Sequence, residues 1–545
     1  MAYHNTETTR LIDTDGTILN ETDDLNLLNQ IIRRNDSAML HQYLAKFPRY
    51  ALGTGETEYY DPFWIAASVG STEVLRVLLD HYNFSYEADP SQIVALDQRE
   101  FLLLNVACDH AHLETARFLL GSQPPFGAVC AKDYHGGTPL LSAAASLQHL
   151  SFDLELCHHD RHGWIRDRLA RGEELMHLLL DKGACASDAI VEVRDNRLEP
   201  RNTVLGRAIT RASYELVRRL LDEGADVHAR QQYYGNGREV GFPIGMYTND
   251  VTALHLGSLF WNAEGIRALL DHRHNASNDH DYGRENENDD LFTCRDSTGR
   301  LPLHWAAGGP GKYDECLLLD DAIVPRIVNT FQLLLASNPH TINDLDHQGA
   351  TPLYYAVGGH AGCGSLHSDL PIRFLCAHGA DASLLDRHGR TVLHALALHS
   401  MYGEPIAPAL LDLLVEHGAD VAHADTDGNT PLHLMARNLR QVEAARYLVR
   451  LGADVRARNA QGDTPLHRAA VGGIGPLQNH EGKMESVTLA SRIRAHDEMI
   501  AAILEGETRG DGSSGLMDQQ NKGGVYKKPA RYKGKGKGAR LAIMN

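Results

Sequence analysis

The residues best suited to metal or acid–base chemistry are the histidines, of which the 545-residue chain has 31. Two short stretches combine histidine with cysteine. The first, "CHHDRH", holds Cys157, His158, His159 and His162, and the second, "HAGCGSLH", holds His360, Cys363 and His367. Zinc sites normally take four ligands at recurring spacings, often a CxxC pair combined with HxxxH. Neither stretch has that spacing, so we predict no metal site and no cofactor.

Other chemical motifs are equally weak. The acidic stretch "NDHDYGRENENDD" (278–290) has the composition of a calcium loop. An EF-hand loop needs glycine at its sixth position, but counting from Asp279 places Gly283 fifth. We find no phosphate-binding glycine loop, no G-x-S-x-G and no H-E-x-x-H. The sequence therefore predicts a protein that is not an enzyme, and a metal-binding or enzymatic protein is the weakest alternative.

A repeated segment explains five of the histidines better. "DGNTPLHLMA" occupies 427–436 and "QGDTPLHRAA" occupies 461–470, so that Thr430 and Thr464 are 34 positions apart. Asp-x-x-Gly is turn chemistry, and Gly428 supplies the positive φ that a tight turn needs. Thr430 suits a helix N-cap and Pro431 the first helical position.

The rest of this copy, up to position 458, predicts a second helix. Val442, Ala445, Leu448 and Val449 recur at helical spacing, and Gly452 follows where a helix C-terminus favours glycine. One copy is therefore a turn and two antiparallel helices. Such a repeat cannot bury its apolar face alone and needs neighbours on either side.

This pattern resembles the ankyrin repeat, whose form is approximately D-x-x-G-x-T-P-L-H-x-A-A, then a second helix, then G-A-D. Further matches are "TPLLSAAA" (138–145), "TALHLG" (252–257), "DSTGRLPLHWAA" (296–307), "DHQGATPLYYAV" (346–357) and "DRHGRTVLHALA" (386–397). The resemblance implies that the motif histidines make structural hydrogen bonds which tie one turn to its neighbour. The residues to which it assigns a structural role are Thr138, Pro139, His255, Pro302, His304, Gly349, Thr351, Pro352, Gly389, His394, Gly428, Thr430, Pro431, His433, Gly462, Thr464, Pro465 and His467.

From these copies we predict an all-α fold, an ankyrin-repeat solenoid of roughly ten to eleven helix-turn-helix repeats. Residues 1–23 form a flexible N-terminus, 24–505 the array and 506–545 a disordered basic tail. Clear repeats lie near 61–82, 101–121, 138–185, 202–230, 251–272, 296–345, 346–385, 386–424, 425–458 and 459–505. Extra residues are expected within repeats, at 146–170 for example. Others are expected between repeats at 187–201, 231–250 and 273–293, where the family has its hairpin fingers.

Charge and cysteine usage limit the possible partners. The net charge is −19, yet the last 25 residues hold eight Lys or Arg and no acid, which leaves −27 on the rest of the chain. An acidic body repels nucleic acid and anionic membranes. The eight cysteines are scattered without a CxxC pair, which favours reduced thiols over a disulfide framework. No apolar run is long enough to span a bilayer and no secretory signal is visible, so we expect a soluble intracellular protein and no membrane partner.

The tail offers three interpretations. Lys527, Lys528, Arg531, Lys533, Lys535, Lys537 and Arg540 are interleaved with two tyrosines. This pattern is compatible with a nuclear import signal, with a nucleic-acid contact, or with a solubilising tail or tether to the acidic array. The resemblance implies a protein–protein interaction scaffold or adaptor that binds partner proteins on the concave ankyrin surface, such as a transcription co-regulator. The expected location is the cytoplasm, the nucleus or both, and the basic tail favours the nucleus. The alternative is a nucleic-acid-associated protein that acts through its tail.

Overall fold

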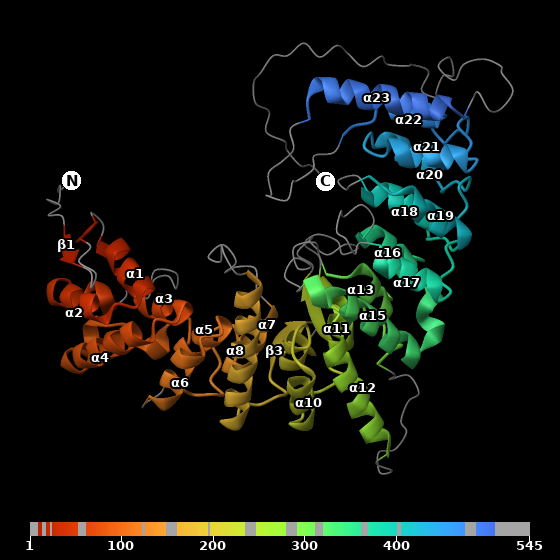
Figure 1. The fold of residues 1–545 in the computed structure, drawn as a ribbon. Helices are drawn as coiled ribbons and strands as arrows, with labels where there is room; N and C mark the ends of the chain where they lie inside the picture. Colours follow the sequence, from red (N-terminus) through yellow and green to blue (C-terminus); the bar gives the residue numbers. More distant parts are fainter. Residues whose placement is uncertain are drawn as a thin grey trace. The chain divides into compact units, whose positions relative to one another are not determined.

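The computed structural model describes residues 9–12, 18–21, 24–52, 61–122, 126–148, 161–194, 197–234, 247–278, 291–310, 320–360, 369–400, 405–474 and 487–506. The chain divides into two compact units, Met1–Thr341 and Ile342–Asn545, the N-terminal unit and the C-terminal unit. Each unit consists mainly of α-helices that pack in pairs (Figure 1).

The N-terminal unit contains helix pairs that follow one another along the chain. They are α1 (Asp24–Arg34) with α2 (Ser37–Lys46), α3 (Pro62–Val69) with α4 (Thr72–Ala88), α5 (Leu103–Asp109) with α6 (Leu113–Gly121), α7 (Pro139–Gln148) with α8 (Arg161–Asp181), α9 (Val204–Ala208) with α10 (Tyr214–Asp222), α11 (Ala253–Leu259) with α12 (Ala263–Asn278), and α13 (Pro302–Gly308) with α15 (Asp320–Ser337). Short 3-10 turns are η1 (Tyr50–Leu52), η3 (Pro90–Gln92) and η4 (Leu96–Gln98), and η6 (Pro339–Asn343) lies at the division between the units.

The C-terminal unit continues the same arrangement. Its pairs are α16 (Pro352–His360) with α17 (Leu370–Ala377), α18 (Val392–His399) with α19 (Pro408–Glu416), α20 (Pro431–Arg437) with α21 (Val442–Arg450), and α22 (Pro465–Ala470) with α23 (Leu489–Leu504). Within each unit the first helices of successive pairs pack against one another, and most second helices do the same. The result is two layers of helices with the apolar core between them.

Local sequence accounts for these helices. The first helix of a pair is short and lies between neighbours on several sides, so that in α13 and α18 nearly every residue is buried. The second helix has one solvent face, and in α21 the buried residues are Val442, Ala444, Ala445, Leu448 and Val449. Several first helices begin with proline, whose missing N–H costs nothing at that position.

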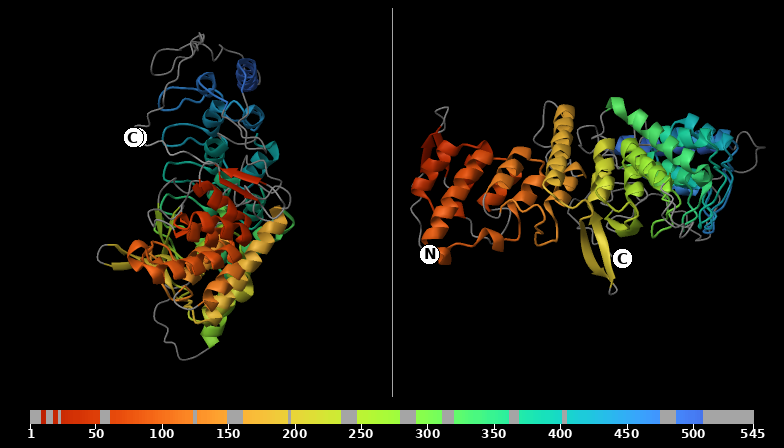
Figure 2. Two further views of the ribbon diagram at one scale, coloured as in Figure 1. Left: turned by 90° about the vertical axis from the view of Figure 1, so that its left-hand side faces the viewer. Right: turned by 90° about the horizontal axis from the view of Figure 1, so that it is seen from below.

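Three antiparallel hairpins accompany the helices of the N-terminal unit. They are β1 (Thr9–Ile12) with β2 (Ile18–Glu21), β3 (Ala189–Arg194) with β4 (Arg197–Thr203), and β5 (Gln231–Tyr234) with β6 (Tyr247–Val251). β4 and β5 lie side by side. A gold two-stranded hairpin extends away from the helices in the right-hand view of Figure 2.

The described residues are rich in helix, as predicted, and the hairpins add detail that the sequence analysis missed. Segment 1–23, predicted to be flexible, contains β1 and β2. The inserts at 187–201 and 231–250 contribute β3–β4 and β5–β6, whereas the insert at 273–293 begins as helix because α12 extends to Asn278. The insert expected at 146–170 is also shorter than predicted, because α8 already begins at Arg161. Composition alone did not separate these helical and hairpin segments from loops.

Candidate functional site

The turns that precede the first helices form a regular structure in the C-terminal unit. They begin at an Asp or Asn whose side-chain Oδ1 accepts hydrogen bonds from the backbone N–H groups two and four residues later, at 2.8–3.0 Å. The fourth residue of each turn is a glycine with φ between 67° and 83°. These turns are 346–349, 386–389, 425–428 and 459–462, and we call them the turn ladder.

Backbone hydrogen bonds join each turn of the ladder to the next. The Arg387 N–H donates to the Gln348 carbonyl at 2.7 Å, and the Thr426 N–H donates to the His388 carbonyl at 2.9 Å. The Ala460 N–H donates to the Asp427 carbonyl at 2.8 Å. Hydrogen bonds hold each turn together and join it to the next turn. The backbone that carries the side chains at the tip of a turn is therefore rigid.

The motif histidines provide a second connection between successive repeats. The Nδ1 of His394 accepts the Thr391 N–H at 3.1 Å, so its proton lies on Nε2, which donates to the Asn429 carbonyl at 3.0 Å. His433 repeats this arrangement with the Thr430 N–H and the Asp463 carbonyl, at 3.1 and 3.0 Å. Each ring therefore caps its own helix and contacts the next turn.

The N-terminal unit contains the same device at His255, which accepts the Thr252 N–H at 3.2 Å and donates to the Arg300 carbonyl at 3.1 Å. Burial lowers the pKa of His255 to about 4, even though Asp296 acts in the opposite direction. Burial also lowers the pKa of His394 and of His433. These rings are neutral near pH 7 and fully engaged, which suits structural support rather than acid–base catalysis.

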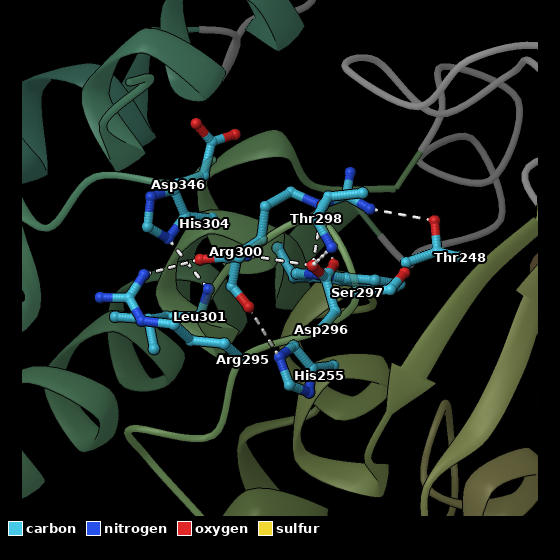
Figure 3. A network of polar contacts seen from close by, with 12 residues as sticks. Thr248, His255, Arg295, Asp296, Ser297, Thr298, Arg300, Leu301, His304 and Asp346 are labelled. Atoms are coloured by element: carbon cyan, nitrogen blue, oxygen red, sulfur yellow. Dashed lines mark hydrogen bonds and ion pairs between the residues drawn. The ribbon is translucent and has the colours of Figure 1, made fainter. Parts of the chain in front are cut away.

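A buried polar network holds the base of the β5–β6 hairpin (Figure 3). Asp296 Oδ2 accepts from the Arg300 Nε–H at 2.8 Å and from the Trp305 Nε1–H at 2.9 Å. The Arg300 Nη2–H donates to Thr248 Oγ1 at 3.0 Å, which connects the network to β6. Burial opposes the charge on Asp296, but the Arg300 guanidinium and other partners outweigh it, and the pKa of this carboxyl falls.

Two further contacts fix the opposite strand of the hairpin. The ring of Tyr233 on β5 packs edge-on against Trp305, with ring centroids 5.3 Å apart. Gln231 Oε1 accepts both the backbone N–H and the hydroxyl of Thr203, each at 2.8 Å, so β5 is also tied to the end of β4. Tyr234, which follows Tyr233 on β5, is 51% exposed. Its side chain therefore faces solvent from a strand that these contacts hold in place.

Large apolar side chains are also exposed beside the turns. Tyr134 is 76% exposed within the turn that precedes α7 in the N-terminal unit. In the C-terminal unit, Leu345 and Leu385 each directly precede the first Asp of a ladder turn, and they are 45% and 38% exposed. Arg387 and His388 are exposed at the tip of the second ladder turn. The ladder thus presents apolar side chains beside the Arg387 guanidinium, a mixture typical of protein-binding surfaces.

The structure places the predicted motif residues at helix starts and turns. Pro139, Pro302, Pro352, Pro431 and Pro465 are the first residues of α7, α13, α16, α20 and α22. The motif glycines Gly349, Gly389, Gly428 and Gly462 all have positive φ. Thr138 and Thr351 precede α7 and α16, and each hydroxyl oxygen accepts the N–H three residues later, at 3.4 and 3.2 Å.

The two remaining motif histidines cap their own helices. His304 Nδ1 accepts the Leu301 N–H at 3.1 Å, and His467 Nδ1 accepts the Thr464 N–H at 3.2 Å. Leu301 has no hydroxyl, so the histidine alone supplies the side-chain part of this cap.

The predicted tail residues 527–540 lie outside the described part of the chain, as do Cys157, His158, His159, Cys363 and His367. The side chains of His162 and His360 are likewise outside it. Within the described ranges, no group of three or more His, Cys, Asp or Glu could hold a metal ion. No described helix has the length and apolar character required to cross a membrane.

A second set of contacts, which was not predicted from the sequence, joins neighbouring helix pairs through residues that lie between the two helices of a pair. The Ser71 hydroxyl donates to the Ile32 carbonyl, and His112 Nε2 lies 2.8 Å from the Ser68 carbonyl. The Asn262 amide donates to the Ile209 and Ala212 carbonyls, both at 2.8 Å, and Asn438 donates to the Ser400 carbonyl at 2.8 Å. These side chains satisfy carbonyls around the end of the preceding first helix. A polar residue recurring just before the second helix is the signal that could have revealed them.

These features define a protein built from stacked helix pairs, with turns linked by hydrogen bonds along one edge. Comparison with protein families agrees, since residues 396–477 match the model described as ankyrin repeats (3 copies). Residues 396–477 therefore contain ankyrin repeats, and the match covers α19, α20, α21, α22 and part of α18. No curated protein matches the chain. Ankyrin repeats are protein–protein interaction modules, so this region belongs to a class of domains that bind proteins.

Proposed function

We propose that the protein is a non-enzymatic scaffold or adaptor that binds one or more partner proteins through the turn ladder and the adjoining first helices. The observation that carries the proposal is the ladder itself. Three backbone hydrogen bonds of 2.7–2.9 Å fix four successive turns, and exposed side chains stand beside them at regular intervals. A preorganised row of side chains binds a partner without a large cost in conformational entropy.

We further propose that the ankyrin array extends over residues 24–505 in roughly ten to eleven repeats. The helix pairs from α1–α2 to α22–α23 support this extent, and the shared histidine device at His255, His394 and His433 supports one repeat type in both units. The flanking segments 1–23 and 506–545 would then lie outside the array.

For the cellular role, we propose a regulatory cofactor such as a transcription co-regulator, with a nuclear rather than a purely cytoplasmic location. The basic tail supports this role, since eight Lys or Arg in the last 25 residues suit an import signal. A fluorescent fusion that shifts from nucleus to cytoplasm when 521–545 are deleted would support it. An unchanged distribution would contradict it.

The binding proposal is tested by affinity capture from native lysate with mass spectrometry, after nuclease treatment. Full-length protein is compared with a chain that ends at Glu505 and with the variant Leu385→Ser/Arg387→Ala. We expect the shortened chain to retain the partners and the ladder variant to lose a defined subset of them. Glu416→Ala is the matched control, because Glu416 is exposed on a second helix away from the turns.

If the ladder variant and the control capture the same proteins as the wild type, the turn ladder is not the recognition surface. If capture instead disappears with the tail or with nuclease, the alternative function applies, namely nucleic-acid association through the tail. Binding of that kind should weaken steeply as salt rises, because released counterions drive it.

A further inference from the structure

Two exposed cysteines occupy neighbouring connections in the N-terminal unit. Cys130 lies between α6 and α7, and Cys185 lies between α8 and β3; both are free and exposed. The Cys130 S–H donates to the Gly183 carbonyl at 3.7 Å, and Gly183 is only two residues before Cys185. Helices α6 and α8 also pack against each other (Figure 1). The Cys130 side chain therefore points at the backbone that carries Cys185.

An equivalent place in the C-terminal unit shows how close these positions come. There the Asn343 amide donates to the Gly379 carbonyl at 3.1 Å, and Asn343 Oδ1 accepts the Asp381 N–H at 2.9 Å. Gly379 and Gly183 both follow a second helix and have φ of 94° and 87°. Cys130 thus stands in the place of Asn343, and Cys185 in the place of Asp381.

The environment of the second cysteine supports this equivalence. Asp381 Oδ1 accepts the hydroxyl of Ser383, two residues later, at 2.6 Å. Cys185 Sγ lies 3.1 Å from the hydroxyl oxygen of Ser187, also two residues later. In other repeats this position is an aspartate that accepts a backbone N–H two residues on, as at Asp226, Asp420 and Asp454. At Cys185 a cysteine replaces this turn-stabilising carboxylate, and Cys130 lies opposite it.

We propose that Cys130 and Cys185 form a redox-active thiol pair, which closes a disulfide between two adjacent helix pairs when a hydroperoxide oxidises it. A single Asn side chain bridges the equivalent backbones in the C-terminal unit, so two cysteine side chains can span the same gap. Solvent exposure gives the oxidant access to both sulfurs. The proposal does not depend on the protein-binding function.

The reaction needs one hydroperoxide for each pair. The thiolate of one cysteine attacks a peroxide oxygen, the O–O bond breaks, and the alkoxide leaves as an alcohol after taking up a proton. The sulfenic acid that forms is attacked by the second thiolate, which creates the S–S bond and expels hydroxide as water. Two thiols are oxidised and one hydroperoxide is reduced to an alcohol and water. With hydrogen peroxide the products are two waters.

The test uses full-length protein that has been reduced, freed of reductant and treated with hydrogen peroxide. Remaining thiols are then blocked with N-ethylmaleimide, and the protein is digested without reduction for mass spectrometry. We expect a cross-linked peptide that joins Cys130 to Cys185, with both thiols lost together and both recovered by dithiothreitol. Cys130→Ser should abolish the cross-link and leave Cys185 blocked by maleimide or oxidised singly.

A second variant tests the geometry separately from the native pair. Asn343→Cys/Asp381→Cys places two thiols at the equivalent positions of the C-terminal unit, and it should form its own cross-link under the same treatment. If this pair cross-links and the native pair does not, the proposal is overturned. It is also overturned if neither pair cross-links, or if Cys185 pairs with another cysteine or with a second copy of the chain.

Discussion

The protonation of His255 should make the N-terminal unit lose stability in mild acid. This ring is 0% exposed, and its pKa is lowered from 6.5 to about 4. In the unfolded chain it binds a proton below about pH 6.5, whereas in the folded chain it stays neutral until about pH 4. Between these limits the unfolded state binds more protons. The free energy of unfolding therefore falls as the pH drops through this window, and the full contribution of the neutral ring is present above it.

The size of the effect follows from the same two values. The interval from 6.5 to about 4 corresponds to about 3 kcal/mol at 1.36 kcal/mol per pH unit. His255→Gln should remove this dependence, because glutamine does not titrate. Gln at the third helical position behind a Thr N-cap also forms a capping box, so the variant keeps one of the two contacts. Near pH 7 the substitution should lower the free energy of unfolding by about 1 kcal/mol, because the hydrogen bond to the Arg300 carbonyl is weakened.

The pH dependence of the free energy of unfolding is measured by urea unfolding at pH values from 7.5 to 4, with tryptophan fluorescence as the signal. All four tryptophans lie in the N-terminal unit, and the Trp305 ring centroid is 5.5 Å from that of His255. We expect the wild type to lose about 3 kcal/mol more than the variant across the window. His135→Gln, which changes an exposed histidine, is the control and should behave as the wild type does. Equal acid sensitivity of His255→Gln and the wild type would refute the reasoning.

Two other perturbations have definite expected outcomes. Asp296→Asn removes one partner of an ion pair whose side chains are 0% and 2% exposed. It should lower the free energy of unfolding by about 3–5 kcal/mol in the same fluorescence assay, while Asp250→Asn, in a half-exposed pair, should cost under about 1 kcal/mol. Gly428→Ala forces a positive φ on alanine and places its Cβ 3.0 Å from the backbone of the next turn. Gly452 also has a positive φ, but the space around it is open. Gly452→Ala should therefore lower the free energy of unfolding by about 1–2 kcal/mol, and Gly428→Ala should lower it by more, as measured by circular-dichroism melts. Equal costs within either matched pair would contradict the packing described here.

The repeat and its helix pairs could be predicted from sequence because their signals are local. Thr430, Pro431 and Gly452 mark helix ends through capping and backbone preferences that act within a few residues, and the structure places helix boundaries at these points. The role of the motif histidines followed from resemblance, since a neutral ring that donates to the next turn is a contact between distant residues. The predicted helix boundaries were wrong where a helix continues into an insert, as at α8 and α12, because amphipathic periodicity there is weak.

The sequence by itself determined the repeated turn and helix pair, the uneven charge and the absence of a recognisable catalytic motif. Only the tertiary structure decided which side chains meet. It showed that Arg300 joins Asp296 to β6, that Asn262 and Asn438 cap a neighbouring helix, and that Cys130 faces the connection that carries Cys185. The physical reason is the separation along the chain over which each interaction acts. Backbone preferences are written in adjacent residues, whereas burial, pKa and contacts between repeats depend on groups brought together from positions tens of residues apart.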